Sequence, residues 1–207
     1  YIATTTYGST EEAEHAVATL ARVHRRVTGT TPDGRPYDAN DPELTTYVNT
    51  TQAYALLRAR QRFAVPPLDR RTADRYVAEM GELAERLGGA PPPRTVKAVH
   101  AYLDERRDVL VLGDQGRDIA SFVLGTPPGT PAAARPLQEL VLGAAIGLLP
   151  RWAAARLGRP FVAPVEHALR PTVAALAAWV DWLAGPSPEE LAARRRVAAG
   201  TSVPVAA

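Results

Sequence analysis

The sequence predicts an all-α protein, a globin-like multi-helix bundle of about eight helices. Apolar residues recur with the three- and four-residue spacing of amphipathic helices along most of the chain. The only stretch typical of a strand, residues 109–112, is a single run of four residues and does not make a sheet. The chain has 207 residues, enough to bury a sizeable core, and no linker divides it. We therefore expect one helical domain over residues 1–200 and a C-terminal tail over residues 201–207.

The first complete helix is predicted to begin at Ser9 and to end near Gly29. Ser9 and Glu12 form a capping-box pattern, in which each side chain accepts a hydrogen bond from the backbone N–H of the other residue. Gly29 suits the left-handed conformation that commonly ends a helix. The predicted inward stripe of this helix consists of Ala13, Ala16, Val17, Leu20, Val23 and Val27.

His24 lies on the same stripe, four residues after Leu20 and seven after Val17. An imidazole that is turned towards a core needs a partner, which can be a hydrogen bond, a carboxylate or a metal ion. Surface or structural roles are expected for the other three histidines, His15, His100 and His167. A hydrogen-bonded core residue is the ordinary role of such a histidine, and among the four histidines His24 is the candidate for a metal ligand.

Further helices are predicted in the first half of the chain. Turn residues predict an ordered loop over residues 30–41, after which Asp41 caps a helix that runs to about Phe63. Its predicted inward residues are Leu44, Tyr47, Val48, Thr51, Ala55 and Ala59. The next helix is expected to open at Asp69 or Thr72, and its inward residues are Ala73, Tyr76, Val77, Met80, Leu83 and Leu87.

The second half is also predicted to be helical. Thr95 is expected to cap a helix with Val96, Val99, Tyr102 and Leu103 inward. Later helices are predicted over residues 114–124, 136–149, 151–157 and 164–184, and from Pro188 onward. The run 136–149 is apolar nearly all round, which predicts burial on most of its sides.

Composition excludes several classes of site and partner. The chain has no cysteine, which excludes disulfides, zinc–thiolate sites, iron–sulfur clusters and thiolate-ligated haem. The formal net charge is +2 and the basic residues are scattered, so we expect no nucleic-acid partner. No apolar run reaches the roughly 18 residues of a membrane span. The common motifs of serine hydrolases, nucleotide-binding proteins and zinc peptidases are missing from the sequence.

The start of the chain resembles the middle of an element, because it begins Tyr1-Ile2-Ala3. We therefore expect that part of the domain, with any targeting signal, precedes Tyr1. Without such a signal, a cytoplasmic location is the expectation. A homo-oligomer is compatible with the sequence.

Several sequence blocks occur in a characteristic order, and the most specific lie before residue 45. These are Thr6 to Ala13, Arg22-Val23-His24 with Val27 and Gly29, Pro32 to Ala39, and Asp41 to Leu44. Less specific blocks follow at Asp74-Arg75-Tyr76 with Glu79, at Ala101-Tyr102-Leu103, and at Gly147 to Pro150. In this order the blocks resemble the MpaB/latex clearing protein (rubber oxygenase) family of haem-dependent oxygenases, and the resemblance covers nearly the whole chain.

The resemblance implies a helical, globin-like fold that holds a b-type haem. The histidine of the family's Val-His block corresponds to His24, which would be the proximal ligand of the iron. Characterised members cleave carbon–carbon double bonds of isoprenoid chains oxidatively, so an apolar unsaturated small molecule and dioxygen are the expected partners. Of the nearby arginines, Arg25 is our candidate for a haem propionate, because it flanks the His24 face by about a quarter turn.

The sequence also departs from the family pattern in two ways. Family members usually carry an arginine and a threonine, and in some cases a lysine as the opposite iron ligand, at positions that would precede Tyr1. Their second helix commonly reads Trp-Val-His, whereas this chain has Tyr47-Val48-Asn49, and an amide is a poor metal ligand.

One alternative to an oxygenase stays open, and a further one is weaker. Asn49 favours a catalytically inactive all-α protein that binds haem or a lipid-like molecule without turnover. The ligand-binding module of a regulator would need a DNA-reading helix-turn-helix with clustered basic residues, which the sequence does not contain.

Overall fold

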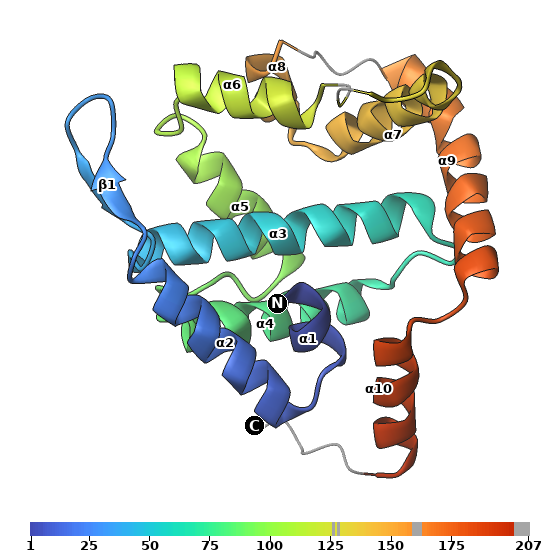
Figure 1. The fold of residues 1–207 in the computed structure, drawn as a ribbon, viewed down its shortest axis with the longest axis horizontal. Helices are drawn as coiled ribbons and strands as arrows, with labels where there is room; N and C mark the ends of the chain where they lie inside the picture. Colours follow the sequence, from blue (N-terminus) through green and yellow to red (C-terminus); the bar gives the residue numbers. More distant parts are fainter. Residues whose placement is uncertain (126, 128, 159–162, 201–207) are drawn as a thin grey trace. The chain divides into compact units, whose positions relative to one another are not determined.

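The computed structural model describes residues 1–125, 127, 129–158 and 163–200, and their fold is predominantly helical (Figure 1). The helices of this described part are α1 (Ile2–Tyr7), α2 (Thr10–His24), α3 (Pro42–Phe63), α4 (Arg70–Arg86), α5 (Val96–Arg106), α6 (Asp114–Val123), α7 (Arg135–Leu148), α8 (Arg151–Arg156), α9 (Ala163–Ala184) and α10 (Pro188–Ala198), with a short 3₁₀ helix at Ala132–Ala134. The all-α prediction is confirmed, whereas the globin-like packing stays a prediction. The predicted tail, residues 201–207, lies outside the described residues.

The predicted helix starts are correct, because side chains just before the helices accept the first free backbone N–H groups. Asp41 accepts from Leu44 at 3.0 Å before α3, and Asp69 accepts from Thr72 at 2.8 Å before α4. Thr95 accepts from Ala98 at 3.1 Å before α5, and Ser187 accepts from Glu190 at 3.1 Å before α10. These short-range contacts depend only on residue type and spacing, so the sequence predicts them well.

A β-hairpin occupies much of the segment that was predicted to be a loop. Strand β1 (Thr28–Thr30) pairs antiparallel with β2 (Pro36–Asp38), with Gly29 opposite Tyr37. The prediction that Gly29 caps the first helix is wrong, because α2 already ends at His24 and the backbone turns there through the bonds Arg26 N–H to Val23 O and Val27 N–H to His24 O. Figure 1 shows the hairpin extending away from α2.

The predicted inward face of α3 is also wrong. Leu44 and Val48 are 40% and 55% exposed, whereas Thr46, Thr50 and neighbouring residues on nearly the opposite side of the helix are buried. The buried residues of α3 are Thr45, Thr46, Asn49, Thr50, Ala53, Tyr54 and Leu57. Small polar side chains thus form the inward face of the first turns. Two of them have hydrogen-bond partners, because Thr45 donates to the Ala39 carbonyl at 3.4 Å and Thr46 donates to the Ala90 carbonyl at 2.7 Å.

The chain forms two compact units, and α3, α4 and α9 contribute residues to both. The first unit contains Tyr1–Thr50, Ala78–Pro93 and the described residues from Val180 onward. In this unit α1 contacts both α2 and α10, and the buried side chains include Val17, Thr46 and Ala84. The second unit contains Thr51–Val77 and the described residues from Arg94 to Trp179, and its core includes Tyr54, Leu57, Ala73, Val77, Val99, Leu103 and Ala154.

Helix α7 is not enclosed as the sequence predicted. None of its residues is buried, and Leu137 and Val141 are 49% and 48% exposed. An apolar composition shows which environment a helix prefers, but it does not supply a neighbouring surface that covers the helix. Within the described residues, no helix combines the length and the apolar character that a bilayer crossing requires.

Candidate functional site

The sequence-predicted site lies at the C-terminal end of α2. The capping box holds the other end of this helix: Ser9 Oγ accepts from the Glu12 N–H at 3.2 Å, and Glu12 Oε2 accepts from the Ser9 N–H at 2.6 Å. The pKa of the Glu12 carboxyl is lowered first by the Ser9 backbone N–H, which donates to it, and then by the Ser9 hydroxyl, with Arg196 as a further favourable charge. A well-capped helix presents its last turn in a defined orientation, and His24 is its last residue.

His24 is half-buried on the same side of α2 as Val17, which is 7% exposed. Its backbone carbonyl accepts from the Val27 N–H at 2.8 Å. No hydrogen bond or ion pair joins the imidazole ring to another residue in the described part of the chain. The ring nitrogens therefore stay free for a ligand, which is the condition that an iron ligand must meet.

The predicted stripe around His24 is only partly inward. Ala13, Ala16 and Leu20 are half-buried, but Val23 and Val27 are 51% and 44% exposed. Val23 is exposed because it lies on the side of α2 that faces a groove, described below.

Arg25 follows His24 directly and is exposed. No described residue forms an ion pair or a side-chain hydrogen bond with its guanidinium group. Arg22, by contrast, donates to Thr19 Oγ1 at 3.0 Å along the same helix. Arg25 thus has a free cationic group next to His24, suited to a carboxylate such as a haem propionate.

Asn49 is 8% exposed and lies on the buried face of α3, in the same unit as His24. Its amide can donate and accept hydrogen bonds, but it does not titrate near neutral pH and is a poor metal ligand. Across the described residues, no group of three or more His, Asp and Glu side chains could hold a metal ion. A haem iron needs only one proximal imidazole from the protein, so this result does not test His24 as a haem ligand.

A groove of about 910 Å³ runs along another side of α2, and the sequence did not predict it. Its walls come from α1, α2 and α10: Tyr1, Thr4, Ser9, Glu11, Glu12, His15, Ala16, Thr19, Leu20, Val23 and Arg196. Arg196 donates to the Tyr7 carbonyl at the end of α1. The spacing of Glu11, His15 and Thr19, four residues apart, is the sequence signal that places three polar side chains on one side of the helix.

The other histidines are not equivalent to His24. His15 is exposed and lines the groove. His100, on α5, is exposed, and its ring meets Tyr54 edge-on with centroids 5.5 Å apart. The side chain of His167 lies outside the described set.

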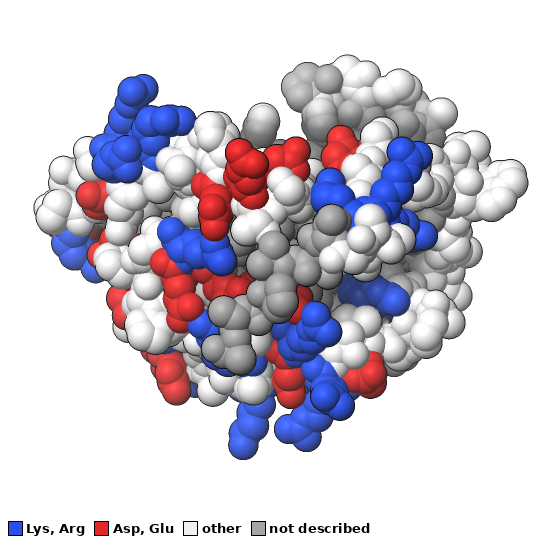
Figure 2. Space-filling view, turned by 90° about the horizontal axis from the view of Figure 1, so that it is seen from below, with Lys and Arg blue, Asp and Glu red and all other residues white. Residues whose placement is uncertain are grey.

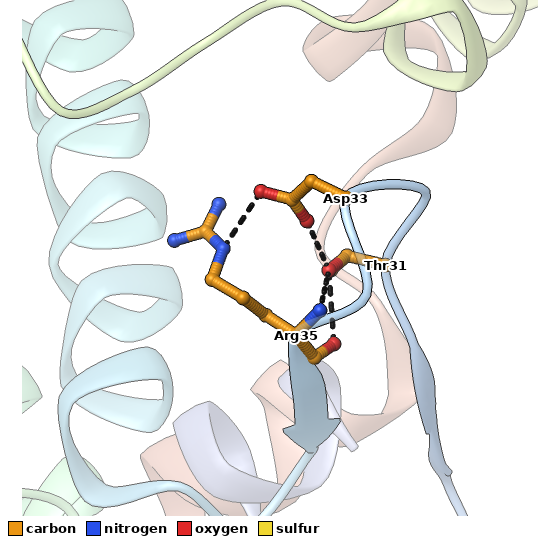
Figure 3. Close-up of polar contacts among 3 residues, drawn as sticks. All are labelled: Thr31, Asp33 and Arg35. Carbon is orange, nitrogen blue, oxygen red and sulfur yellow. Dashed lines mark hydrogen bonds and ion pairs between the residues drawn. The ribbon is translucent and has the colours of Figure 1, made fainter.

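Asp33 and Gly34, which belong to the specific sequence blocks, form the tip of the hairpin (Figure 3). The Thr31 hydroxyl and the Arg35 Nε–H both donate to the Asp33 carboxylate, the latter at 2.8 Å, and Gly34 has a positive φ of 84°. The Thr31 bond, followed by Arg35, lowers the pKa of Asp33. These three polar side chains satisfy one another, so this block is a structural turn.

Charged side chains are interspersed on the molecular face drawn in Figure 2, where lysine and arginine lie beside aspartate and glutamate. Ion pairs among the described residues include Arg86 with Glu14 at 3.2 Å and Arg194 with Glu190 at 2.5 Å. Exposed pairs of this kind contribute little to stability.

Comparison with known proteins identifies one family. The model described as "ER-bound oxygenase mpaB/B'/Rubber oxygenase, catalytic domain" matches residues 1–182. No curated protein and no solved structure matches the chain significantly. The matched segment includes α2, His24 and the hairpin.

Proposed function

The chain belongs to the mpaB and rubber oxygenase family of catalytic domains, and we propose that it is a haem-dependent oxygenase with His24 as the proximal iron ligand. The observation that carries this proposal is the state of the His24 ring, which is half-buried and has no competing partner among the described residues. A neutral imidazole in that state can offer one nitrogen to iron and the other to a hydrogen-bond acceptor.

In this proposal the protein binds and orients the haem and the substrate, and the haem supplies the redox chemistry. A bound b-type haem would supply iron able to activate dioxygen for the oxidation of a carbon–carbon double bond. His24 would hold the iron, and the guanidinium group of Arg25 would pair with a propionate. The substrate is an apolar, unsaturated small molecule, for which an isoprenoid chain is the model.

Absorption spectroscopy tests the ligand assignment directly. Protein from cells grown with a haem precursor is expected to show a Soret band, and His24→Ala is expected to lose or shift it. His15→Ala is the matched control, because His15 lies on the same helix but is exposed and on another side. A folded, colourless wild-type protein that takes up no added haem would contradict the proposal, and so would an unchanged spectrum in His24→Ala.

A second function, haem or lipid binding without turnover, is favoured by Asn49. This buried amide stands where the family pattern has a histidine, and it cannot move a proton as an imidazole can. Oxygen consumption with an unsaturated isoprenoid separates the two functions, since a carrier consumes none. If the missing imidazole alone limits activity, Asn49→His is expected to raise the rate. A cytoplasmic location and a homo-oligomeric state stay predictions.

A further inference from the structure

The groove beside α2, here called the α2 groove, has an elongated lining. Residues from Ser9 to Val23 contribute to it, which corresponds to about 21 Å along the axis of an α-helix. All of its lining residues belong to the first compact unit. Its length suits an extended molecule better than a compact one.

Polarity changes along the α2 groove. Ser9, Glu11, Glu12 and His15 line the part near the start of α2, where Arg196 also lies. Ala16, Leu20 and Val23 line the part near the end of the helix, interrupted only by Thr19. A ligand that matches this lining has one polar end and one apolar end.

The polar end of the α2 groove contains hydrogen-bond acceptors. The Glu12 carboxylate is already engaged by the Ser9 N–H, and the Arg196 guanidinium donates to the Tyr7 carbonyl. Glu11 and His15 lie four residues apart on α2, and neither side chain has a hydrogen bond or ion pair with another residue in the described part. A carboxylate and a neutral imidazole nitrogen both accept hydrogen bonds, so these two side chains favour a head group that donates them.

The apolar end leads towards the candidate iron ligand. Val23 precedes His24 in the chain, and Leu20 lies one turn before His24. A chain that lies over Leu20 and Val23 therefore ends near the last turn of α2. The exposure of Val23, at 51%, leaves apolar surface there that a bound chain would cover.

We propose that the α2 groove binds a linear amphiphile, whose hydroxyl or amine head donates hydrogen bonds to Glu11 and His15 and whose acyclic hydrocarbon chain lies over Leu20 and Val23. The identification of this amphiphile as the substrate rests on the proposed oxygenase function. Binding itself does not require haem, so the two proposals can fail separately.

Calorimetric titration of the full chain with dodecylamine, dodecanol and dodecanoate, each below its micelle concentration, tests the groove. The amine and the alcohol are expected to bind more tightly than the carboxylate, because the free carboxylate of Glu11 repels an anion. Glu11→Gln is expected to weaken amine binding about three- to ten-fold, and Val23→Trp to weaken all three by filling the apolar end. Glu14→Gln, which changes a carboxylate of the same helix outside the groove lining, is the control and is expected to leave binding unchanged.

Equal affinity for the three head groups, no binding by the wild-type protein, or no effect of Glu11→Gln would each overturn the groove proposal. Circular dichroism of each variant checks that the helical fold is retained. Haem uptake without amphiphile binding would contradict this inference alone. Amphiphile binding without haem uptake would contradict the oxygenase proposal and leave the groove as a ligand site.

Discussion

The hydroxyl group of Thr46 donates a hydrogen bond of 2.7 Å to the backbone carbonyl of Ala90, which is 44 residues further along the chain. Thr46 is 1% exposed, so this bond joins the first turns of α3 to the segment after α4 inside the first unit. A second link runs beside it, from the Ala90 N–H to the Pro42 carbonyl at 3.0 Å. Together the two bonds provide partners for the Ala90 N–H and for the carbonyls of Ala90 and Pro42.

Replacement of this hydroxyl is expected to destabilise the fold. Thr46→Val keeps the side-chain shape but leaves the Ala90 carbonyl without its donor, at an expected cost of about 1–3 kcal/mol in the free energy of unfolding. Thr46→Ser keeps a hydroxyl and is expected to lose less. Urea unfolding followed by circular dichroism measures both variants, and a Thr46→Val protein as stable as wild type would contradict the role of this bond.

The hairpin depends on the close approach of Tyr37 to Gly29. A Cβ atom on Gly29 would lie 2.8 Å from the Tyr37 ring, closer than real contacts allow. Gly29→Ala is therefore expected to displace the Tyr37 ring, which is 44% exposed, and to lower the free energy of unfolding by up to about 1 kcal/mol. Because the clash is with one side chain, Tyr37→Ala in the same protein should relieve it. Additive losses of stability in the double variant would contradict this explanation.

Features of the fold that depend on residues close together in the chain were predicted correctly, and a feature that depends on distant residues was not. Asp41, Asp69 and Thr95 were predicted correctly as helix caps, because capping depends on residues three positions apart. The inward face of α3 was not predicted correctly, because the burial of Thr46 depends on a carbonyl 44 residues away. An apolar pattern cannot reveal a polar face that is buried through such bonds.

Of the candidate site, the sequence predicted the parts that depend on helical spacing and missed the part that depends on tertiary packing. The position of His24 on the Val17 side of α2 follows from helical spacing, and the structure agrees with it. The α2 groove was not predictable, because it needs α1 and α10 beside α2 and so depends on tertiary packing. Glu11 and His15 were recognisable in the sequence only as polar residues one turn apart.

Acid is expected to weaken the start of α2 through Glu12. The pKa of this carboxyl lies below its ordinary value of 4.5, chiefly because the Ser9 backbone N–H donates to it. A lowered pKa in the folded state gives stability that is present above the ordinary value and is lost as the pH falls through the folded value. Glu12→Gln is therefore expected to flatten the dependence of unfolding free energy on pH in that acidic range.

Urea titrations from about pH 6 down to about pH 3 measure this dependence. Ser9→Ala provides the comparison, because it removes the hydroxyl but keeps the backbone N–H, which is the larger cause of the shift. It should lower stability at all these pH values by about 1 kcal/mol and retain most of the acid dependence. Identical pH profiles for wild type and Glu12→Gln would contradict the prediction.

Arg25 is expected to contribute to haem affinity without changing the iron ligand. Its guanidinium group is exposed and lies about 100° around α2 from His24, whereas Arg26 lies about 160° away from His24. An exposed ion pair with a propionate is a weak interaction, so Arg25→Gln should weaken haem binding about two- to five-fold and leave the Soret maximum in place. Arg26→Gln, which removes the same charge on the far side of the helix, should leave haem affinity unchanged.

Haem titrations at low and high salt measure both effects, and the difference between the two variants should shrink with salt because the pair is exposed. Equal losses of affinity in the two variants would mean that only the net charge matters, and that Arg25 has no specific contact.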